Sequence, residues 1–456
     1  MESFMRYGIY KDSCVEWIGR VPEGWTVDKL KRSVVNLKNG VWGDESNGDE
    51  NDVFCVRVAD FNRNNFEVDT EEFTIRNLEK DKQRAYLLKK GDLLIEKSGG
   101  GEKQPVGFVV RYHKDEPAVY ANFMARMDLN REIAYSNFFK YVHSSLYAQR
   151  INARSIKQTT GIQNLDTNLY LQEYVAYPPL EEQIYISEFL DQKTAEIDKL
   201  IADKTKLLSL LDEHRQTIIT EAITKGIDSN IKMKRTGLEW VVEMPEHWNV
   251  RKIKHVLSYI EYGISESGKG EGEYKILTMG NINNGEITFP NDGALNDLDE
   301  KYLVDTNDLL FNRTNSLEQI AKVGIFRGSK EDKITFASYL VRLKVKKEEV
   351  DSEYLNYLLN CRNFITYARS FAIQSISQAN LNANRYTNLP IILPSLNEQI
   401  RIKKWLINQT KNIADVIKEI TDQIMKLKEY RQSLIFEVVT GKIDVRDVAA
   451  EVIETA

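Results

Sequence analysis

The segment that comes closest to a phosphate-binding loop is 263–270, which has the Gly and Lys spacing of a P-loop. Its last position does not fit, because Gly270 stands where a Ser or Thr hydroxyl must reach magnesium. Glu266 also places an anion where phosphates would lie. The run Gly99-Gly100-Gly101 lacks the dinucleotide-binding pattern and is interpreted as a hairpin tip. The sequence therefore predicts loops here and no nucleotide site.

The search for other catalytic motifs is equally negative. Amino-methylating enzymes need Asn or Asp before Pro-Pro and an aromatic ring, which hold and stack the flipped base. The segment 177–180, Tyr-Pro-Pro-Leu, has the prolines alone, and 393–396, Leu-Pro-Ser-Leu, has lost the second one. The five histidines form no i, i+4 zinc pair, and no Ser or Cys lies in a nucleophile elbow. We predict no catalytic residue and no metal site, and expect a binding protein that is not an enzyme.

Basic residues gather in two stretches that contain no acid. The chain of 456 residues has a net charge of −6, which argues against contacts with phosphates when taken as a total. The stretch 133–165 nevertheless contains no Asp or Glu, and neither does 354–397. Their bases favour nucleic acid over the alternative, a packing face for a partner protein. These bases are Lys140, Arg150, Arg154 and Lys157 in the first stretch and Arg362, Arg369 and Arg385 in the second.

The chain contains a long internal repeat. The block from Glu16-Trp17 to Trp25 returns as Glu239-Trp240 to Trp248, an offset of 223 residues (240 − 17). The block that starts at Pro178 returns at Pro394, an offset of 216 (394 − 178). The first copy therefore has seven extra residues between its two blocks, and the chain consists of two similar halves. The tryptophan blocks are expected to dock a short extended arm onto a core.

Between the repeated blocks, each half has strand-rich sequence broken by Gly, Asn and Asp turns, which is typical of a small α/β domain. Segments 52–58, 93–96 and 106–112 are expected strands in the first half, and 274–279, 309–312 and 323–327 in the second.

After Pro178 and Pro394, apolar residues recur at alternating spacings of four and three, which predicts two long helices packed as a coiled coil. The expected fold is α/β (α+β), with two similar domains separated by an antiparallel coiled coil and related by an internal pseudo-twofold axis. Self-association through the same seams is the alternative. We expect a first domain with its N-terminal arm at 1–178, a helix at 179–228, a second domain at 229–394, a helix at 395–445 and a tail at 446–456.

Three cysteines without metal-ligand spacing suit a reducing compartment. No apolar run approaches the length of a membrane span, and the N-terminus lacks a signal-peptide core. We therefore expect a cytoplasmic protein without a membrane partner.

The order of these blocks, duplicated around two variable middles, resembles the DNA-specificity subunit of a type I restriction-modification system over the whole chain. The motifs that carry the resemblance are the two tryptophan blocks and the helix starts at 178–183 and 393–399. The resemblance implies that each middle is a target-recognition domain for one half of a bipartite, non-palindromic sequence in double-stranded DNA. It also implies two methyltransferase subunits that bind the long helices, and restriction subunits that join them. S-adenosylmethionine, ATP and Mg would belong to those partners, with no cofactor in this chain.

Candidate site residues follow from the resemblance and from the basic stretches. The family's hairpin, normally Arg-Thr/Ser-Gly, corresponds to Lys97-Ser98-Gly99 and Arg313-Thr314-Asn315, which depart from it slightly. Phosphates are expected to bind Arg150, Arg154, Lys157, Arg362 and Arg369. Base edges are expected to contact Gln158, Gln163, Gln374, Gln378 and Arg313. For any one of the amides, the alternative is a hydrogen bond to the main chain within a loop. The expected contacts with methyltransferase subunits are Glu182, Gln183, Glu398 and Gln399.

Three alternatives remain open at this point. The first is the specificity subunit of a modification-only adenine methyltransferase. The second is a self-standing DNA-modifying enzyme, which would need a cofactor site. The third is a coiled-coil scaffold without DNA contacts.

Overall fold

The computed structural model describes residues 5–159, 161–265, 272–291, 295–375 and 378–446. The chain forms two compact units. Unit 1 comprises residues 1–205 and 421–456, and unit 2 comprises residues 206–420. The P-loop-like segment expected to be a loop lies mostly outside the described residues.

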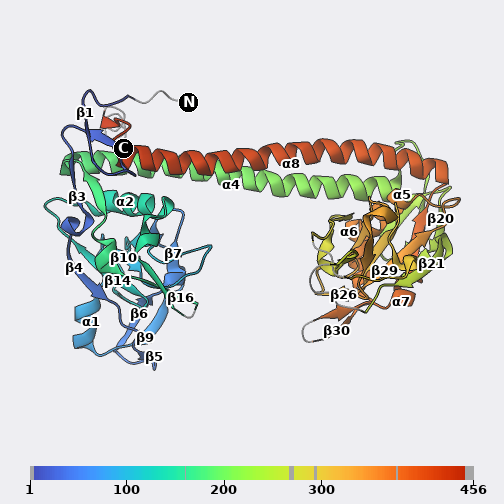
Figure 1. Ribbon diagram of the computed structural model, residues 1–456. Helices are drawn as coiled ribbons and strands as arrows, with labels where there is room; N and C mark the ends of the chain where they lie inside the picture. Colours follow the sequence, from blue (N-terminus) through green and yellow to red (C-terminus); the bar gives the residue numbers. More distant parts are fainter. Residues whose placement is uncertain (1–4, 160, 266–271, 292–294, 376–377, 447–456) are drawn as a thin grey trace. The chain divides into compact units, whose positions relative to one another are not determined.

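The centre of unit 1 is a six-stranded sheet in the order β4-β14-β10-β12-β8-β7. Its central strand β10, with the sequence Leu-Leu-Ile-Glu, is buried at every position, as expected for a strand covered on both faces. Helix α2 (Ser136–Ala148) lies between this sheet and the long helix α4 (Figure 1). The strands are β4 (Val34–Asn39), β14 (Met124–Leu129), β10 (Leu93–Glu96), β12 (Val109–Arg111), β8 (Glu67–Val68) and β7 (Phe61–Asn62).

Smaller sheets surround this core. One is four-stranded, β13-β6-β9-β5, and another is three-stranded, β11-β16-β15. Their strands are β13 (Ala118–Tyr120), β6 (Asp52–Val56), β9 (Thr74–Asn77), β5 (Asp44–Glu45), β11 (Ser98–Gly99), β16 (Ile162–Leu165) and β15 (Ile156–Thr159). The remaining elements are β1 (Tyr10–Asp12), β2 (Arg20–Pro22), β3 (Thr26–Lys29), β17 (Tyr174–Tyr177), α1 (Lys80–Tyr86) and α3 (Thr167–Tyr170).

Unit 2 repeats this topology. Its six-stranded sheet has the order β21-β29-β25-β27-β24-β23, and the register is conserved between the copies, since Leu94↔Arg126 becomes Leu310↔Arg342. The strands are β21 (Leu257–Tyr262), β29 (Leu340–Val345), β25 (Leu309–Asn312), β27 (Val323–Ile325), β24 (Glu286–Ile287) and β23 (Ile282–Asn283). The three-stranded sheet is β26 (Thr314–Asn315), β31 (Ala379–Asn380) and β30 (Ile373–Gln374).

The two units differ in the elements that accompany the large sheet. Unit 1 has α1 and the four-stranded sheet, whereas the described part of unit 2 has the parallel pair β22 (Lys275–Leu277) and β28 (Ile334–Phe336). The other elements of unit 2 are β18 (Met233–Leu238), β19 (Val241–Pro245), β20 (Asn249–Lys252), β32 (Pro390–Leu393), α5 (Ser352–Asn360), α6 (Arg362–Arg369) and α7 (Ala383–Thr387).

Two long helices, α4 (Leu180–Lys225) and α8 (Leu396–Val439), complete the fold. At 1.5 Å per residue they are about 69 and 66 Å long. Each begins directly after a proline-containing turn and ends at a glycine with positive φ, Gly226 or Gly441. At the end of α8, Gly441 N–H donates to Val438 O and Lys442 N–H donates to Glu437 O, which is the Schellman pattern.

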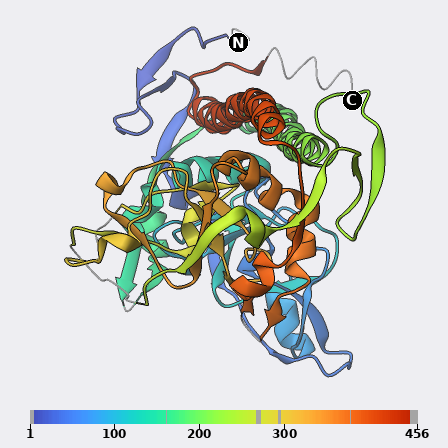
Figure 2. The same ribbon diagram turned by 90° about the vertical axis from the view of Figure 1, so that its right-hand side faces the viewer.

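The helices pack side by side and run antiparallel within each unit (Figure 2). In unit 1, Arg431 bonds to Asp198 and Lys204 bonds to Gln423. In unit 2, Ile219 shares a core with Leu406. Every seam position expected from the four-three spacing is buried or half-buried. The fold-class prediction of α/β domains joined to two packed long helices is confirmed.

The tryptophan blocks fasten the arms to this framework. Trp25 and Trp248 are almost fully buried, and Trp248 Nε1 donates to Glu398 Oε1 at 3.0 Å. In unit 1, Met5 of the N-terminal arm also forms an isolated antiparallel β-bridge with Asp444, which follows α8. The arms are therefore structural.

Within the described ranges, none of the helices is both long enough and apolar enough to cross a membrane.

Candidate nucleic-acid interface

The family-like hairpin and the amide-rich segment of unit 1 meet in one small sheet. We call β11, β16 and β15 hairpin sheet 1. Ser98 pairs with Asn164 in the ladder, and its Oγ donates to Asn164 Oδ1 at 2.6 Å. Gln158 is exposed on the outer strand. Residues 66 positions apart in sequence thus combine into one polar surface.

Gln163 behaves differently from the other predicted amides. Its side chain is only 6% exposed, and its Oε1 accepts a hydrogen bond from Val106 N–H at 3.3 Å. An amide that satisfies a buried backbone donor is committed to the fold. The Gln163 side chain therefore stabilises hairpin sheet 1 from its buried face and does not face solvent.

A cation stands at the edge of hairpin sheet 1. Lys97 Nζ donates to Asn39 Oδ1 at 2.5 Å, so a residue of β4 sets its direction. Partial burial lowers the pKa of the Lys97 ammonium. This ammonium is half-buried and held in place beside Ser98.

Unit 2 contains the equivalent surface, hairpin sheet 2, made of β26, β31 and β30. Asn380 Nδ2 donates to Thr314 Oγ1 at 2.8 Å, in the place of the Ser98–Asn164 pair. Gln374 and Gln378 are both exposed, and Asn315 is half-buried. The polar frame of the two hairpin sheets is thus the same.

The cation of hairpin sheet 2 is held by a ring. Arg313 lies over Tyr262 with its Cζ 5.3 Å from the ring centroid, and Tyr262 occupies the position that Asn39 has in unit 1. A guanidinium stacked on an aromatic ring keeps its donors in a fixed plane. Both units therefore hold a basic side chain beside a hydroxyl of the hairpin sheet.

The three predicted phosphate contacts of unit 1 are exposed at or next to hairpin sheet 1. Arg150 follows α2 with a left-handed φ of 58°, and Arg154 is 59% exposed at its side chain. Lys157 lies on β15 and pairs with Asp166 at 2.8 Å. An exposed pair of this kind is weak, so the Lys157 ammonium can exchange Asp166 for another anion.

The two predicted contacts of unit 2 lie elsewhere. Arg362 is exposed at the start of α6, on a hollow that Thr410 and Lys411 of α8 also line. Arg369 donates to the main-chain oxygens of Glu318 and Ile320, and burial lowers its pKa. Arg369 therefore holds the loop after β26, and neither arginine belongs to hairpin sheet 2.

The four residues expected to bind methyltransferase subunits are used inside the chain. Gln183 and Gln399 are fully buried and bracket equivalent loops: Gln183 bonds Tyr135 N and Ile133 O, and Gln399 bonds Asp351 N and Glu349 O. Glu182 accepts from Tyr7 Oη at 2.5 Å, and Glu398 from Trp248 and His247. These contacts hold the helix starts within each unit, and binding to methyltransferase subunits stays a prediction.

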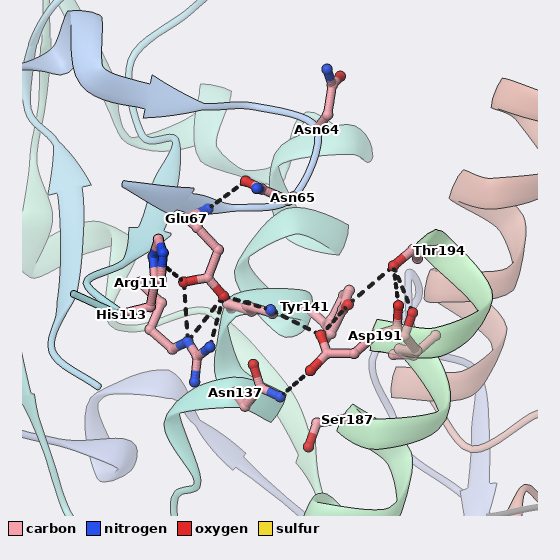
Figure 3. A network of polar contacts seen from close by, with 12 residues as sticks. Asn64, Asn65, Glu67, Arg111, His113, Asn137, Tyr141, Ser187, Asp191 and Thr194 are labelled. Atoms are coloured by element: carbon pink, nitrogen blue, oxygen red, sulfur yellow. Dashed lines mark hydrogen bonds and ion pairs between the residues drawn. The ribbon is translucent and has the colours of Figure 1, made fainter. Parts of the chain in front are cut away.

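A buried polar network fixes the domain of unit 1 on α4 (Figure 3). Glu67 of β8 pairs with Arg111 and with Lys140 of α2, both at 2.8 Å. Lys140 also reaches Asp191 of α4 at 2.9 Å, and Tyr141 Oη donates to the same carboxylate at 2.7 Å. Burial, followed by the nearby Asp191 carboxylate, raises the pKa of Tyr141. Hairpin sheet 1 is therefore built on a domain that is tied to the helix.

Sequence reasoning missed the residues that orient the predicted ones, namely Asn39, Asn164, Tyr262 and Asn380. A signal for two of them exists, because Asn164 and Asn380 lie 216 residues apart, at the offset of the second repeat (380 − 164). Asn39 and Tyr262 share the offset of 223 but not a residue type, which hides their common position.

Together, each hairpin sheet combines amides, a hydroxyl and one oriented cation. Base edges in a DNA groove are recognised by the same donors and acceptors, with Arg or Lys to guanine and Gln or Asn to adenine. Exposed Arg and Lys side chains beside the sheet can bind DNA phosphates. The arrangement of unit 1 is chemically that of a nucleic-acid interface.

Comparisons with known proteins agree with this geometry. The family model described as "Type I restriction modification DNA specificity domain" matches residues 22–208 and 245–426. The StySPI specificity subunit of Salmonella potsdam is 21% identical over 432 residues, which cover 93% of this chain and 90% of that protein. The MjaVIII specificity subunit of Methanocaldococcus jannaschii is 26% identical over 317 residues, 67% of this chain and 71% of the relative.

Solved structures show the same fold. A chain from a study of assembly and conformational transition of the type I R-M system has a TM-score of 0.69 at 13% identity, covering 92% of this chain and 98% of its own length. The HsdS subunit from Thermoanaerobacter tengcongensis has a TM-score of 0.50 at 14% identity, with coverage of 93% and 98%. Because two matched segments account for most of the sequence, the chain belongs to the type I restriction-modification DNA-specificity family, whose members determine DNA target recognition, are not themselves catalytic, and leave cofactors to partner subunits.

Proposed function

We propose that this chain recognises a bipartite, non-palindromic target in double-stranded DNA, with one half-site for each hairpin sheet. The observation that carries the proposal is the repeated surface: two hairpin sheets share one frame but carry unlike side chains. Lys97 and Asn39 in unit 1 stand where unit 2 has Arg313 and Tyr262. Unlike surfaces read unlike bases, so the two halves of the target differ.

The residue roles in this proposal follow from exposure. Base edges are read by the exposed or half-buried side chains Lys97, Ser98, Gln158, Arg313, Asn315, Gln374 and Gln378, and the buried Thr314 hydroxyl accepts from Asn380 and supports hairpin sheet 2. Phosphates are held by Arg150, Arg154, Lys157 and Arg362. Gln163 and Arg369 keep the loops in shape, because their polar atoms already bond within the fold.

The pseudo-twofold relation between the domains 1–178 and 229–394 belongs to this proposal. The unread gap between the half-sites would be set by the spacer helices, expected at 179–228 and 395–445 and observed as α4 and α8. Exposed apolar side chains on these helices, including Leu200, Leu210 and Met425, offer a surface for two methyltransferase subunits. The predicted partner contacts at the helix starts, Glu182, Gln183, Glu398 and Gln399, would lie at the ends of this surface.

The partners supply the chemistry. In the proposed complex the methyltransferase subunits bind S-adenosylmethionine and modify adenine, and restriction subunits join them to cleave DNA with ATP and Mg. A net charge of −6 supports this division, because the chain alone neutralises few phosphates. The proposed place of action is the cytoplasm.

The test is a map of methylated adenines in the genome of a cell that carries this chain with its cognate methyltransferase subunits. We expect one motif with two unlike specified halves and a constant unspecified gap. A palindromic motif, a single uninterrupted motif, or methylation that does not depend on this chain would contradict the proposal.

A further inference from the structure

Two large aromatic side chains stand in solvent at the same place in both units. Phe123 is 54% exposed and Tyr339 is 47% exposed, and they are separated by the 216-residue offset of the second repeat (339 − 123). Neither ring stacks on another aromatic ring or lies under a cation among the residues that the structure describes.

Both rings occupy the third position of a tight turn. Met124 N–H donates to Ala121 O at 3.2 Å, and Leu340 N–H donates to Ala337 O at 2.9 Å. Met124 and Leu340 are fully buried and begin the central strands β14 and β29. The turns are therefore anchored, and the exposure of the rings is a property of the fold.

The turns are bonded to the hairpin sheets. Phe123 O accepts from Lys97 N–H at 2.8 Å and from Ser98 N–H at 3.1 Å. Tyr339 O accepts from Arg313 N–H at 3.0 Å. Each turn is thus bonded through its main chain to the residue that carries the oriented cation at the start of the hairpin sheet.

A single exposed aromatic residue needs no explanation, because much of a protein surface is apolar. Here the side chains around the turns have changed between the copies, from Lys97 to Arg313 and from Asn39 to Tyr262, while an exposed ring has stayed. The surrounding cations also make the surface attractive to a polyanion. Both facts indicate that the ring contacts the molecule that the hairpin sheet contacts.

We propose that Phe123 and Tyr339 contact base edges of duplex DNA and contribute to the choice of bases, one in each half-site. This inference rests on the proposed function. An aromatic ring packs well on the C5-methyl group of thymine in the major groove. Tyr339 adds a hydroxyl that can bond a neighbouring acceptor or donor. The two halves would therefore differ at this position as well.

The test measures methylation by the assembled complex on DNA libraries in which each half-site is randomised in turn. Phe123→Ala is expected to lower the preference at one base pair of the first half about tenfold, the scale of a single base contact, and to leave the second half unchanged. Tyr339→Ala is expected to do the reverse. Tyr339→Phe keeps the ring and should lose less of the preference than Tyr339→Ala, namely the part that the hydroxyl supplies.

Controls separate this contact from folding and from the proposed function. Val242 on the arm is 72% exposed, and Val242→Ala should change neither the base preference nor the melting temperature. The aromatic variants should also keep the melting temperature, since their rings are exposed.

Unchanged preferences in both alanine variants would overturn the inference, and so would an equal loss at all sequences, as expected for a ring that wedges or stacks without selectivity. Loss in Tyr339→Phe equal to that in Tyr339→Ala would exclude the ring as the contact. If Arg313→Ala also leaves both half-sites unchanged, the proposed function itself fails.

Discussion

The ion pairs of strand β8 in unit 1 and of strand β24 in unit 2 differ in burial. Glu67 is 9% exposed at its side chain and pairs with Arg111 and Lys140, whereas Glu286 is 53% exposed and pairs with Arg327, the counterpart of Arg111 at the 216-residue offset. Asp191, which receives Lys140 and Tyr141 on α4, has Ile407 in its place. In unit 1, Lys140 thus connects the buried Glu67 to Asp191 of α4. In unit 2, the Glu286–Arg327 pair is exposed, and Ile407 of α8 has no charge.

The hairpin sheets differ in the opposite way. Their frame is repeated, with Ser98–Asn164 matched by Thr314–Asn380, while the exposed amides, cations and rings vary. The comparison teaches that the two units share strand order and the pairing of the hairpin sheets while their side chains differ. Differences at exposed positions of the hairpin sheets are expected if these positions face different bases.

The largest expected effect concerns the buried carboxylate. Glu67→Ala leaves Lys140 and Arg111 without their shared partner in a buried site, which should cost about 3 kcal/mol. Glu286→Ala removes an exposed pair and should cost less than about 1 kcal/mol. Hydrogen exchange of α2 and α5 in the full chain measures both. Equal loss of protection in the two variants would refute the assigned difference in burial.

A second contrast separates His143 from Leu359, its counterpart. His143 is fully buried, bonds to Tyr170 at 2.8 Å, and burial lowers its pKa from 6.5 to about 3. His143 takes up a proton near pH 6.5 in the unfolded chain but not in the folded chain. The contribution of neutral, buried His143 to the free energy of unfolding is therefore complete above pH 6.5 and falls as the pH decreases below it.

The loss should be about 1.4 kcal/mol per pH unit, or roughly 2 kcal/mol at pH 5. Calorimetry at pH 7 and pH 5 should show a smaller acid shift of the melting temperature for His143→Leu than for the unchanged chain. Equal shifts would mean that His143 is protonated in the folded state.

The oriented cations provide a smaller effect on selectivity. Arg313→Ala should reduce discrimination at one base of the second half-site about tenfold, and Lys97→Ala should act on the first half-site only. Binding of the assembled complex to libraries randomised in each half gives the result. If either change alters both halves, the assignment of one half-site to each hairpin sheet is wrong.

The smallest effect on selectivity is expected from the exposed basic side chains that contact phosphates. Arg150→Ala combined with Arg154→Ala should weaken binding about equally for all sequences and lower the slope of log affinity against log salt by roughly two. Binding by the complex at several salt concentrations checks this. An unchanged slope would favour a scaffold whose DNA contacts all come from its partners.

The framework was accessible from sequence because it depends on local periodicity. The alternation of four and three positions predicted α4 and α8, and apolar runs such as 93–96 and 309–312 predicted the central strands. The side-chain roles depended on contacts between distant residues. Gln163 and Gln158 look alike in sequence. The side-chain oxygen of Gln163, however, accepts a hydrogen bond from the main-chain N–H of Val106, 57 residues away.

The repeat alone does not assign a role to a residue. Gln183 and Gln399 recur at the 216-residue offset and bracket equivalent loops, so folding accounts for their repetition, and their predicted contact with methyltransferase subunits stays a prediction. Phe123 and Tyr339 recur at the same offset, but a pair of aromatic residues in a strand-rich sequence is ordinarily taken as core. Only their exposure distinguishes them.

The central claim is that each unit reads its own half-site, and one exchange tests it most directly. Residues 32–165 are replaced by the matching segment of a relative with a different target, and methylated adenines are mapped in cells that carry the hybrid with its methyltransferase subunits. The account predicts a new first half-site, with the second half-site and the gap retained. A motif that changes in both halves, or in neither, would contradict it.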